Sequence, residues 1–176
     1  KAAQAGVTPV ELFLDETDRS DGSVMLSLPI LNQDYEAIET MLHDDSIVMG
    51  LADAGAHVGQ IMDSSQPTYF LSHWVRDTGF FSLEEGVRRI TSDTADLFGL
   101  VDRGRIVEGA YADINVIDFD RLSLTGPEYV HDFPGGAGRY IQRGAGYDAT
   151  IVNGQVFMEH GEHTGALAGV TLRSTD

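Results

Sequence analysis

The sequence has no cysteine and few basic residues, and both shortages narrow the roles that the protein can have. Its 176 residues include 11 Lys and Arg against 28 Asp and Glu, which gives a formal net charge of −17. A surface this acidic repels phosphate backbones and anionic lipids, so we expect no nucleic acid and no membrane among its partners. Without cysteine, the chain has neither a disulfide framework nor a thiolate metal site.

Long apolar runs are also absent. No run approaches the roughly 18 residues that a membrane span requires, and residues 1–9 lack the apolar core of a secretory signal. Hydrophobic residues make up 42% of the chain and charged residues 22%, which is close to the globular average and argues against disorder. We therefore expect a soluble, cytoplasmic chain that is large enough to bury a core.

The first hundred residues follow a pattern of strands and helices. Short apolar runs at 24–28 and 47–51 predict buried strands, and the apolar spacing within 32–43 predicts a helix between them. This order favours a parallel βαβ unit. Residues 15–22 predict a solvated loop rather than a calcium site, because acidic ligands are missing at the required spacing. Four further helices are predicted, beginning near Pro9 and covering 67–77, 83–90 and 92–99.

The residues after about 100 are rich in turns and short strands. Residues 104–109 predict a turn, a strand and a second turn, and residues 112–118 alternate polar and apolar side chains as a strand does. The pair Asn153-Gly154, which lies between two apolar runs, predicts a two-residue β-hairpin. The chain is thus expected to divide into a part with βα units, 1–103, and a β-rich part, 104–176.

Asp53 is the strongest candidate for chemistry. It follows the predicted strand 47–51 in a loop of small residues, and catalytic groups of α/β folds collect at the carboxyl ends of parallel strands. A carboxylate there can ligate a divalent cation and exchange protons with a bound water. The alternative is a residue that caps a helix or lies in a plain loop. His57, four residues on, can contact a substrate or a metal, or serve only as a hydrogen-bonding residue.

Three other features carry weaker signals. Residues 63–64 precede a predicted helix, where capping is the expected role. His160 and His163 have a spacing that some zinc sites use, but Gly161 favours a turn between them, and no cysteine or second histidine pair accompanies them. The glycine-rich segment 135–138 lacks the Gly-Lys-Ser/Thr ending of a phosphate loop, so we expect a flexible loop.

Five segments, taken in order and spacing, form a pattern that a known family shares. They are Gly50–His57, Thr91–Leu100, Asp102–Ile106, Gly109–Asp118 and Ile151–Gly154. Together they resemble the C-terminal third of the amidohydrolase superfamily, and the branch of N-acyl-D-amino-acid deacylases and D-aminoacylases is the most similar. The ending Gly161–Ala166 resembles that branch specifically.

The resemblance implies an α/β fold, namely a metal-dependent hydrolase with a (β/α)₈ TIM barrel and a small β-sandwich. Residues 24–28 and 47–51 would be the seventh and eighth barrel strands. Residues 1–103 would hold the last βα units of the barrel, and 104–176 would belong to the sandwich. Asp53 would match the family's aspartate at the end of the last strand. There it would ligate the metal, take a proton from the hydrolytic water and return that proton to the leaving amine.

The resemblance also implies that much of the enzyme lies outside this chain. A catalytic zinc needs about three protein ligands, and the family's His-x-His pair and later histidine ligands are on earlier strands that this sequence does not contain. We therefore expect the C-terminal segment of a larger enzyme with one or two zinc ions, inactive in isolation. The expected partners are a small-molecule amide substrate, the missing N-terminal part of the same enzyme and a second copy that covers open strand edges.

The substrate is only partly indicated. The deacylases tend to carry an arginine after the last strand that meets the substrate carboxylate, but residues 54–67 contain no Arg or Lys. The missing arginine widens the expected substrates from N-acyl amino acids to other amides, cyclic amides and related compounds with a non-peptide C–N bond. His57 and Asn32, which lies at the mouth of the preceding strand, are predicted to bind substrate. The alternative function is a non-catalytic binding or assembly module derived from the same fold.

Overall fold

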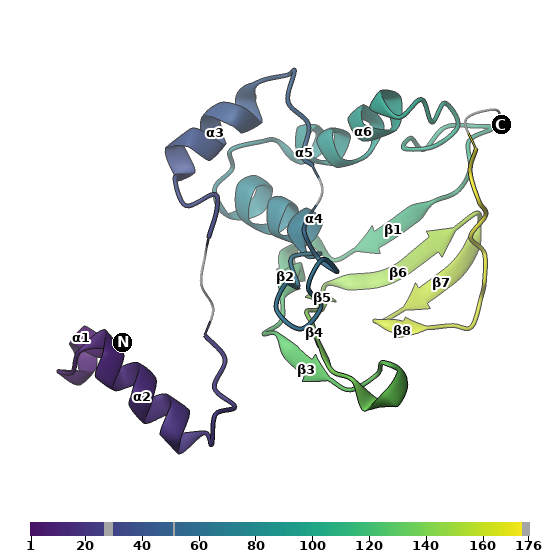
Figure 1. Ribbon diagram of the computed structural model, residues 1–176. Helices are drawn as coiled ribbons and strands as arrows, with labels where there is room; N and C mark the ends of the chain where they lie inside the picture. The colour runs from purple at the N-terminus through teal and green to yellow at the C-terminus, as the bar shows by residue number, and fades with distance from the viewer. Residues whose placement is uncertain (27–29, 51, 174–176) are drawn as a thin grey trace. The chain divides into compact units, whose positions relative to one another are not determined.

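The computed structural model describes residues 1–26, 30–50 and 52–173, and the chain forms two compact units, Lys1–Asp44 and Asp45–Asp176 (Figure 1). The units divide well before residue 103, so the assignment of 1–103 and 104–176 as separate domains stays a prediction. No helix within the described ranges has the length and apolar character needed to cross a membrane.

The first unit is helical in the part that the structure describes. Its elements are α1 (Ala2–Ala5), α2 (Pro9–Arg19) and α3 (Tyr35–His43). Helix α2 begins at Pro9 as predicted, because Thr8 and Glu11 form a reciprocal capping box at 3.2 and 2.8 Å. Hydrogen bonds from Thr8 lower the pKa of Glu11 below its usual range. Helix α2 continues to Arg19, so the loop prediction is wrong for residues 15–19, where an Arg19–Glu16 ion pair (2.7 Å) supports the last turn.

The two predicted barrel strands do not form in the described residues. Residues 24–26 and 47–50 have no regular secondary structure, and residues 27–28 and 51 lie outside the described part. The strand pairs that the structure describes are all antiparallel. A strand requires a neighbouring strand to complete its hydrogen bonds, and none of the described strands pairs with these residues. The parallel βαβ prediction is therefore wrong for these residues, and the TIM barrel of the whole enzyme stays a prediction.

The three helices predicted at 67–77, 83–90 and 92–99 form in the second unit as four successive elements, because the first is divided in two. They are α4 (Gln66–Tyr69), the π-helix η1 (Phe70–Asp77), α5 (Leu83–Ile90) and α6 (Ser92–Leu97). Ser82 starts α5 by accepting a hydrogen bond from the main-chain N–H of Glu85 (3.2 Å). Helix α5 lies close to η1 because it carries Gly86, where a side-chain carbon would be 2.4 Å from a methyl group of Val75.

The core of the second unit is built mainly from η1 and the residues around it. Its buried apolar side chains are Phe70, Leu71, Trp74, Val75, Phe81, Ala95, Leu122 and Ala168. The rings of Phe70 and Phe81 lie 5.6 Å apart. Arg76 joins η1 to the strands by donating hydrogen bonds to the carbonyl oxygens of Phe119 (3.1 Å) and Leu122 (2.6 Å).

Antiparallel strands form the rest of the unit. Strands β1 (Ile114–Ile117), β6 (Tyr147–Val152), β7 (Gln155–Glu159) and β8 (Glu162–His163) lie in the order β1-β6-β7-β8 (Figure 1). Strand β2 (Ser123–Leu124) pairs with β5 (Gly144–Ala145), and β3 (Glu128–Val130) pairs with β4 (Arg139–Ile141). A short 3₁₀ helix occupies Phe119–Arg121. Residues 134–136 form a tight turn in which Gly135 and Gly136 both have a φ of 73°, so the glycine-rich segment lies in a loop.

The predicted hairpin at Asn153-Gly154 is confirmed, since it joins β6 and β7 with φ values of 48° and 79°. Positive φ at both positions is the requirement of the turn that Asn-Gly favours. The strand predicted within 104–109 does not form. Ile106 and Val107 are 83% and 60% exposed, and no described strand pairs with them.

Arg103 joins three of the segments that carry the family resemblance. Its guanidinium binds the Asp113 carboxylate and donates to the side-chain oxygen of Asn153 (3.1 Å). The main-chain N–H of Asn153 donates to Asp113 (2.7 Å), and the Tyr111 ring lies 4.3 Å from the guanidinium carbon. These contacts connect the loop after α6, the start of β1 and the β6–β7 turn, so the three segments meet in one structural junction.

Candidate functional site

Asp53 begins a segment of tight turns. The N–H of Ala56 donates to the carbonyl oxygen of Asp53 (3.1 Å), and the N–H groups of Gln60 and Ile61 donate to that of His57 (2.7 and 2.8 Å). The next helix begins only at Gln66. Asp53 therefore does not cap a helix, and the catalytic role and the plain loop position both remain as predictions for it.

The side chains of Asp53 and His57 are both exposed. None of the residues that the structure describes forms a hydrogen bond or an ion pair with either side chain. A carboxylate without partners can accept a proton or ligate a cation, and an imidazole can do the same or donate a proton. The structure thus places both predicted residues in one loop and leaves their functional atoms available.

Three hydrogen bonds, here called the anchor bonds, attach the end of this loop to the β-rich part of the unit. The N–H of Tyr140 in β4 donates to the carbonyl oxygen of Val58 (3.0 Å). The Ser65 hydroxyl donates to the side-chain oxygen of Gln142 (2.7 Å), and the hydroxyls of Thr68 and Tyr147 are 2.7 Å apart. In Figure 1 the loop accordingly lies beside β4 and β5.

The capping role predicted for residues 63–64 is not observed. The residue at the N-cap of α4 is Ser65, whose side chain makes no capping hydrogen bond. Its hydroxyl binds Gln142 instead. The sequence shows no sign of this, because Ser65 and Gln142 are 77 residues apart and neither belongs to a periodic pattern.

Asn32 is not brought to this loop by any described contact. It has a positive φ of 54° and is exposed, and it belongs to the first compact unit, whereas Asp53 and His57 belong to the second. Its role in substrate binding stays a prediction.

The described residues do not form a metal site by themselves, since no group of three or more His, Asp or Glu side chains comes together in these ranges. His163 has a local role: its Nδ1 accepts a hydrogen bond from the N–H of Gly165 (2.8 Å), and its ring lies 4.6 Å from that of Phe157. His160, with φ of 48°, occupies the turn between β7 and β8, as Gly161 indicates. The weak zinc hypothesis for this histidine pair gains no support.

A hollow of about 320 Å³ opens on the strands, and the residues that line it include Arg143, Tyr147, Met158 and His160. Neither Asp53 nor His57 lines this hollow. It is therefore separate from the loop that carries the predicted chemistry.

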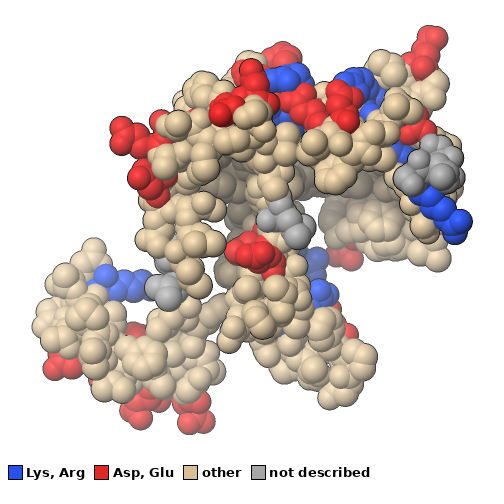
Figure 2. All heavy atoms as spheres, turned by 45° about the horizontal axis from the view of Figure 1, so that its top comes forward, with Lys and Arg blue, Asp and Glu red and all other residues tan. Residues whose placement is uncertain are grey.

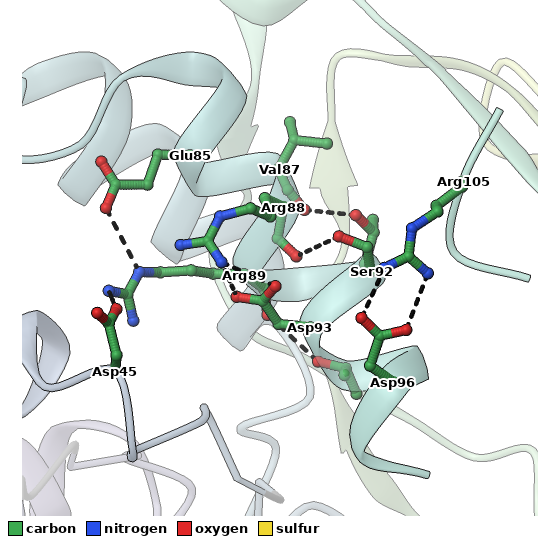
Figure 3. Close-up of polar contacts among 11 residues, drawn as sticks. Asp45, Glu85, Val87, Arg88, Arg89, Ser92, Asp93, Asp96 and Arg105 are labelled. Atoms are coloured by element: carbon green, nitrogen blue, oxygen red, sulfur yellow. Dashed lines mark hydrogen bonds and ion pairs between the residues drawn. The ribbon is translucent and has the colours of Figure 1, made fainter. Parts of the chain in front are cut away.

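The arginines of α5 and the following loop form a network with acidic residues (Figure 3). Arg88 binds Asp93 (2.7 Å), and Arg105 binds Asp96 through two hydrogen bonds (2.9 and 2.6 Å). The Arg105 guanidinium lowers the pKa of Asp96 below its usual range. On the face that Figure 2 shows, acidic side chains are more frequent than basic ones, and the basic side chains along the top of the view lie next to acidic ones. The network uses arginines for structure and leaves little positive charge for binding phosphate.

Arg89 connects this network to the segment before Asp53. Its side chain is 9% exposed, binds Asp45 (3.2 Å) and lies 3.8 Å from Glu85. Its guanidinium also stacks over Phe81, 4.9 Å from the ring centre. Sequence reasoning missed this residue, because an arginine in a helix resembles any solvated charge until its packing is known.

A model of the amidohydrolase family matches residues 3–158. This chain belongs to the amidohydrolase family. An uncharacterised protein of Mycobacterium tuberculosis is 29% identical over 160 residues, which cover 86% of this chain and 25% of that protein. The D-aminoacylase of Alcaligenes xylosoxydans xylosoxydans is 34% identical over 105 residues, or 60% of this chain and 20% of that enzyme. The N-acyl-D-glutamate deacylase of the same organism is 43% identical over 55 residues, or 31% of this chain and 11% of that enzyme.

The resemblance to D-aminoacylase-like amidohydrolases is thereby confirmed. A crystal structure of D-aminoacylase is 33% identical and aligns with a TM-score of 0.47 over 58% of this chain and 20% of that one. The chain spans about a quarter of the length of its mycobacterial relatives.

Proposed function

We propose that this chain forms the part of a larger amidohydrolase that carries the catalytic carboxylate, Asp53. The whole enzyme hydrolyses the C–N bond of an amide, and N-acyl amino acids are the leading substrate class. Family membership and the similarity to a D-aminoacylase and an N-acyl-D-glutamate deacylase support the reaction. The observation that carries the role of Asp53 is its carboxylate, which is exposed and has no partner among the described residues, in a segment that the family shares.

In this proposal Asp53 acts as general base and then as general acid. Its carboxylate takes a proton from the water that attacks the amide carbonyl, and it returns the proton to the nitrogen as the C–N bond breaks. The exchange suits a carboxylate because the same group accepts the proton in the first step and donates it in the second. His57, in the next turn of the loop, contacts the substrate, and Asn32 is proposed to do so as well.

The metal of the proposed enzyme is zinc, one or two ions, as the family resemblance implies. The described residues do not fit such a site on their own, because a zinc site takes about three protein ligands and they bring no such group together. Asp53 would supply one carboxylate, and the remaining ligands would lie in the missing N-terminal part of the enzyme. A cytoplasmic location and a homo-oligomer belong to the same proposal.

The decisive experiment replaces Asp53 with Asn in the whole enzyme and measures hydrolysis of a panel of N-acyl-D-amino acids. Asparagine keeps the size of the side chain but cannot carry the proton, so we expect kcat to fall about 10²- to 10⁴-fold. Asp63→Asn is the matched control, since Asp63 is an exposed aspartate in the same segment, and we expect near-normal turnover. Near-normal turnover of D53N would overturn the assignment and favour the non-catalytic binding module.

A further inference from the structure

We infer that the segment joining β4 to β6 holds the Asp53 loop in its working position, with Gln142 as the main positioning residue. This inference rests on the proposed role of Asp53 and adds a second requirement for turnover, namely that the loop carrying Asp53 is held in position. The β-rich part of the chain would then be needed for turnover, although it contributes no reacting group.

The loop has little to hold it in place from within. Its own hydrogen bonds close turns between residues three or four apart, such as Gln60 to His57. Bonds of this kind fix the shape of a turn but not its position relative to the rest of the molecule.

The attachments on the two sides of the loop differ. On the entry side, Asp45 binds Arg89 at 3.2 Å, and the Asp45 side chain is 90% exposed. Exposed ion pairs contribute little because water and salt screen them. On the exit side, the Ser65–Gln142 and Thr68–Tyr147 bonds are partly buried and join residues 77 and 79 positions apart. The anchor bonds therefore restrain the position of the loop from its exit side.

Gln142 is suited to this role because both ends of its amide are engaged. Its side-chain oxygen accepts from Ser65 (2.7 Å), and its side-chain nitrogen donates to the carbonyl oxygen of Thr125 (3.0 Å). Thr125 is held in turn by its N–H bond to the carbonyl oxygen of Arg143 (2.9 Å). The amide is thus fixed by the strands on one side and presents its acceptor to Ser65 on the other.

The test combines turnover with hydrogen–deuterium exchange in the whole enzyme. Gln142→Leu removes both amide bonds, whereas Gln142→Glu keeps an acceptor for Ser65 but loses the donor to Thr125 and places a carboxylate oxygen against the Thr125 carbonyl. Thr150→Val is the matched control, because it removes a hydrogen bond to Asn115 (2.8 Å) between β6 and β1 without touching the loop. Exchange is read in a peptide covering residues 52–66.

For Gln142→Leu we expect several-fold faster exchange in this peptide. We also expect kcat to fall about tenfold and KM to change less, because a catalytic group displaced by about 1 Å loses much of its effect. Gln142→Glu should recover part of the lost kcat. Adding Ser65→Ala to Gln142→Leu should cause no further loss, since both changes remove the same bond. Thr150→Val should leave the exchange and kcat near normal.

Unchanged kcat in Gln142→Leu, or the same losses in Thr150→Val, would overturn the inference. Comparing D53N with Gln142→Leu distinguishes failure of this inference from failure of the proposed function. If D53N stays active, the proposed role of Asp53 is wrong, and the anchor bonds then have no catalytic role. If D53N is inactive while Gln142→Leu is normal in both measurements, only the positioning role is wrong.

Discussion

Leu122 provides the sharpest test of the packing of the second unit. Its side chain is 0% exposed, and its carbonyl oxygen accepts a hydrogen bond from Arg76 (2.6 Å). On the other side the main chain of Gly146 lies directly against it, since a side-chain carbon on Gly146 would be 2.7 Å from the Leu122 Cα. These main-chain contacts limit how far the surroundings can collapse. We therefore expect Leu122→Ala to leave a cavity and to lower the free energy of unfolding by about 3 kcal/mol.

The assay is equilibrium unfolding of the chain in urea, followed by the fluorescence of Trp74. Trp74 is the single tryptophan and is 5% exposed, so its emission reports the opening of this core. The midpoint should fall while the slope of the transition stays constant. Leu167→Ala is the control, because Leu167 is 89% exposed, and it should change the unfolding free energy by less than about 0.5 kcal/mol. A loss for Leu122→Ala as small as that of the control would refute the packing argument.

Two further predictions concern the strands. Arg139 donates two hydrogen bonds to Asp132 (2.8 and 2.7 Å), and these bonds lower the pKa of Asp132 below its usual value of 3.8. The pair therefore stabilises the fold above pH 3.8, and this stabilisation is lost as the pH falls through the lowered pKa. Arg139→Gln should return the pKa of Asp132 to its usual range in an NMR titration, and an unmoved titration would contradict the assigned cause. Gly154→Ala should destabilise the chain by about 1 kcal/mol because φ there is 79°. Gly126→Ala, at a position with open space and no positive φ, should cost less; equal melting temperatures for the two variants would argue against the described turn.

Local signals in the sequence predicted the elements whose cause is itself local. The start of α2 at Pro9, the helix at 83–90 and the Asn153-Gly154 turn were all confirmed at the expected residues. Each depends on a hydrogen bond or a backbone preference within a few residues of the chain. Nothing outside that stretch is needed to form it.

Strands were predicted less well, because a strand depends on a partner elsewhere in the chain. The apolar runs at 24–28 and 47–51 have the composition of strands, yet their described residues form none. The composition of a segment indicates only that its side chains are compatible with a buried strand. Whether a strand forms depends on a partner that offers hydrogen bonds, and no described segment of this chain offers them here.

The sequence by itself determined the family, the loop that carries Asp53 and His57, and the change from helices to strands near residue 100. These are properties of ordered motifs and local turns. Only the tertiary structure decided that Arg103, Asp113 and Asn153 form one junction, and that Gln142 and Tyr147 restrain the end of the Asp53 loop. Contacts of this kind join polar residues tens of positions apart, and a hydrogen bond between two such residues leaves no periodicity in the chain for a sequence pattern to reveal.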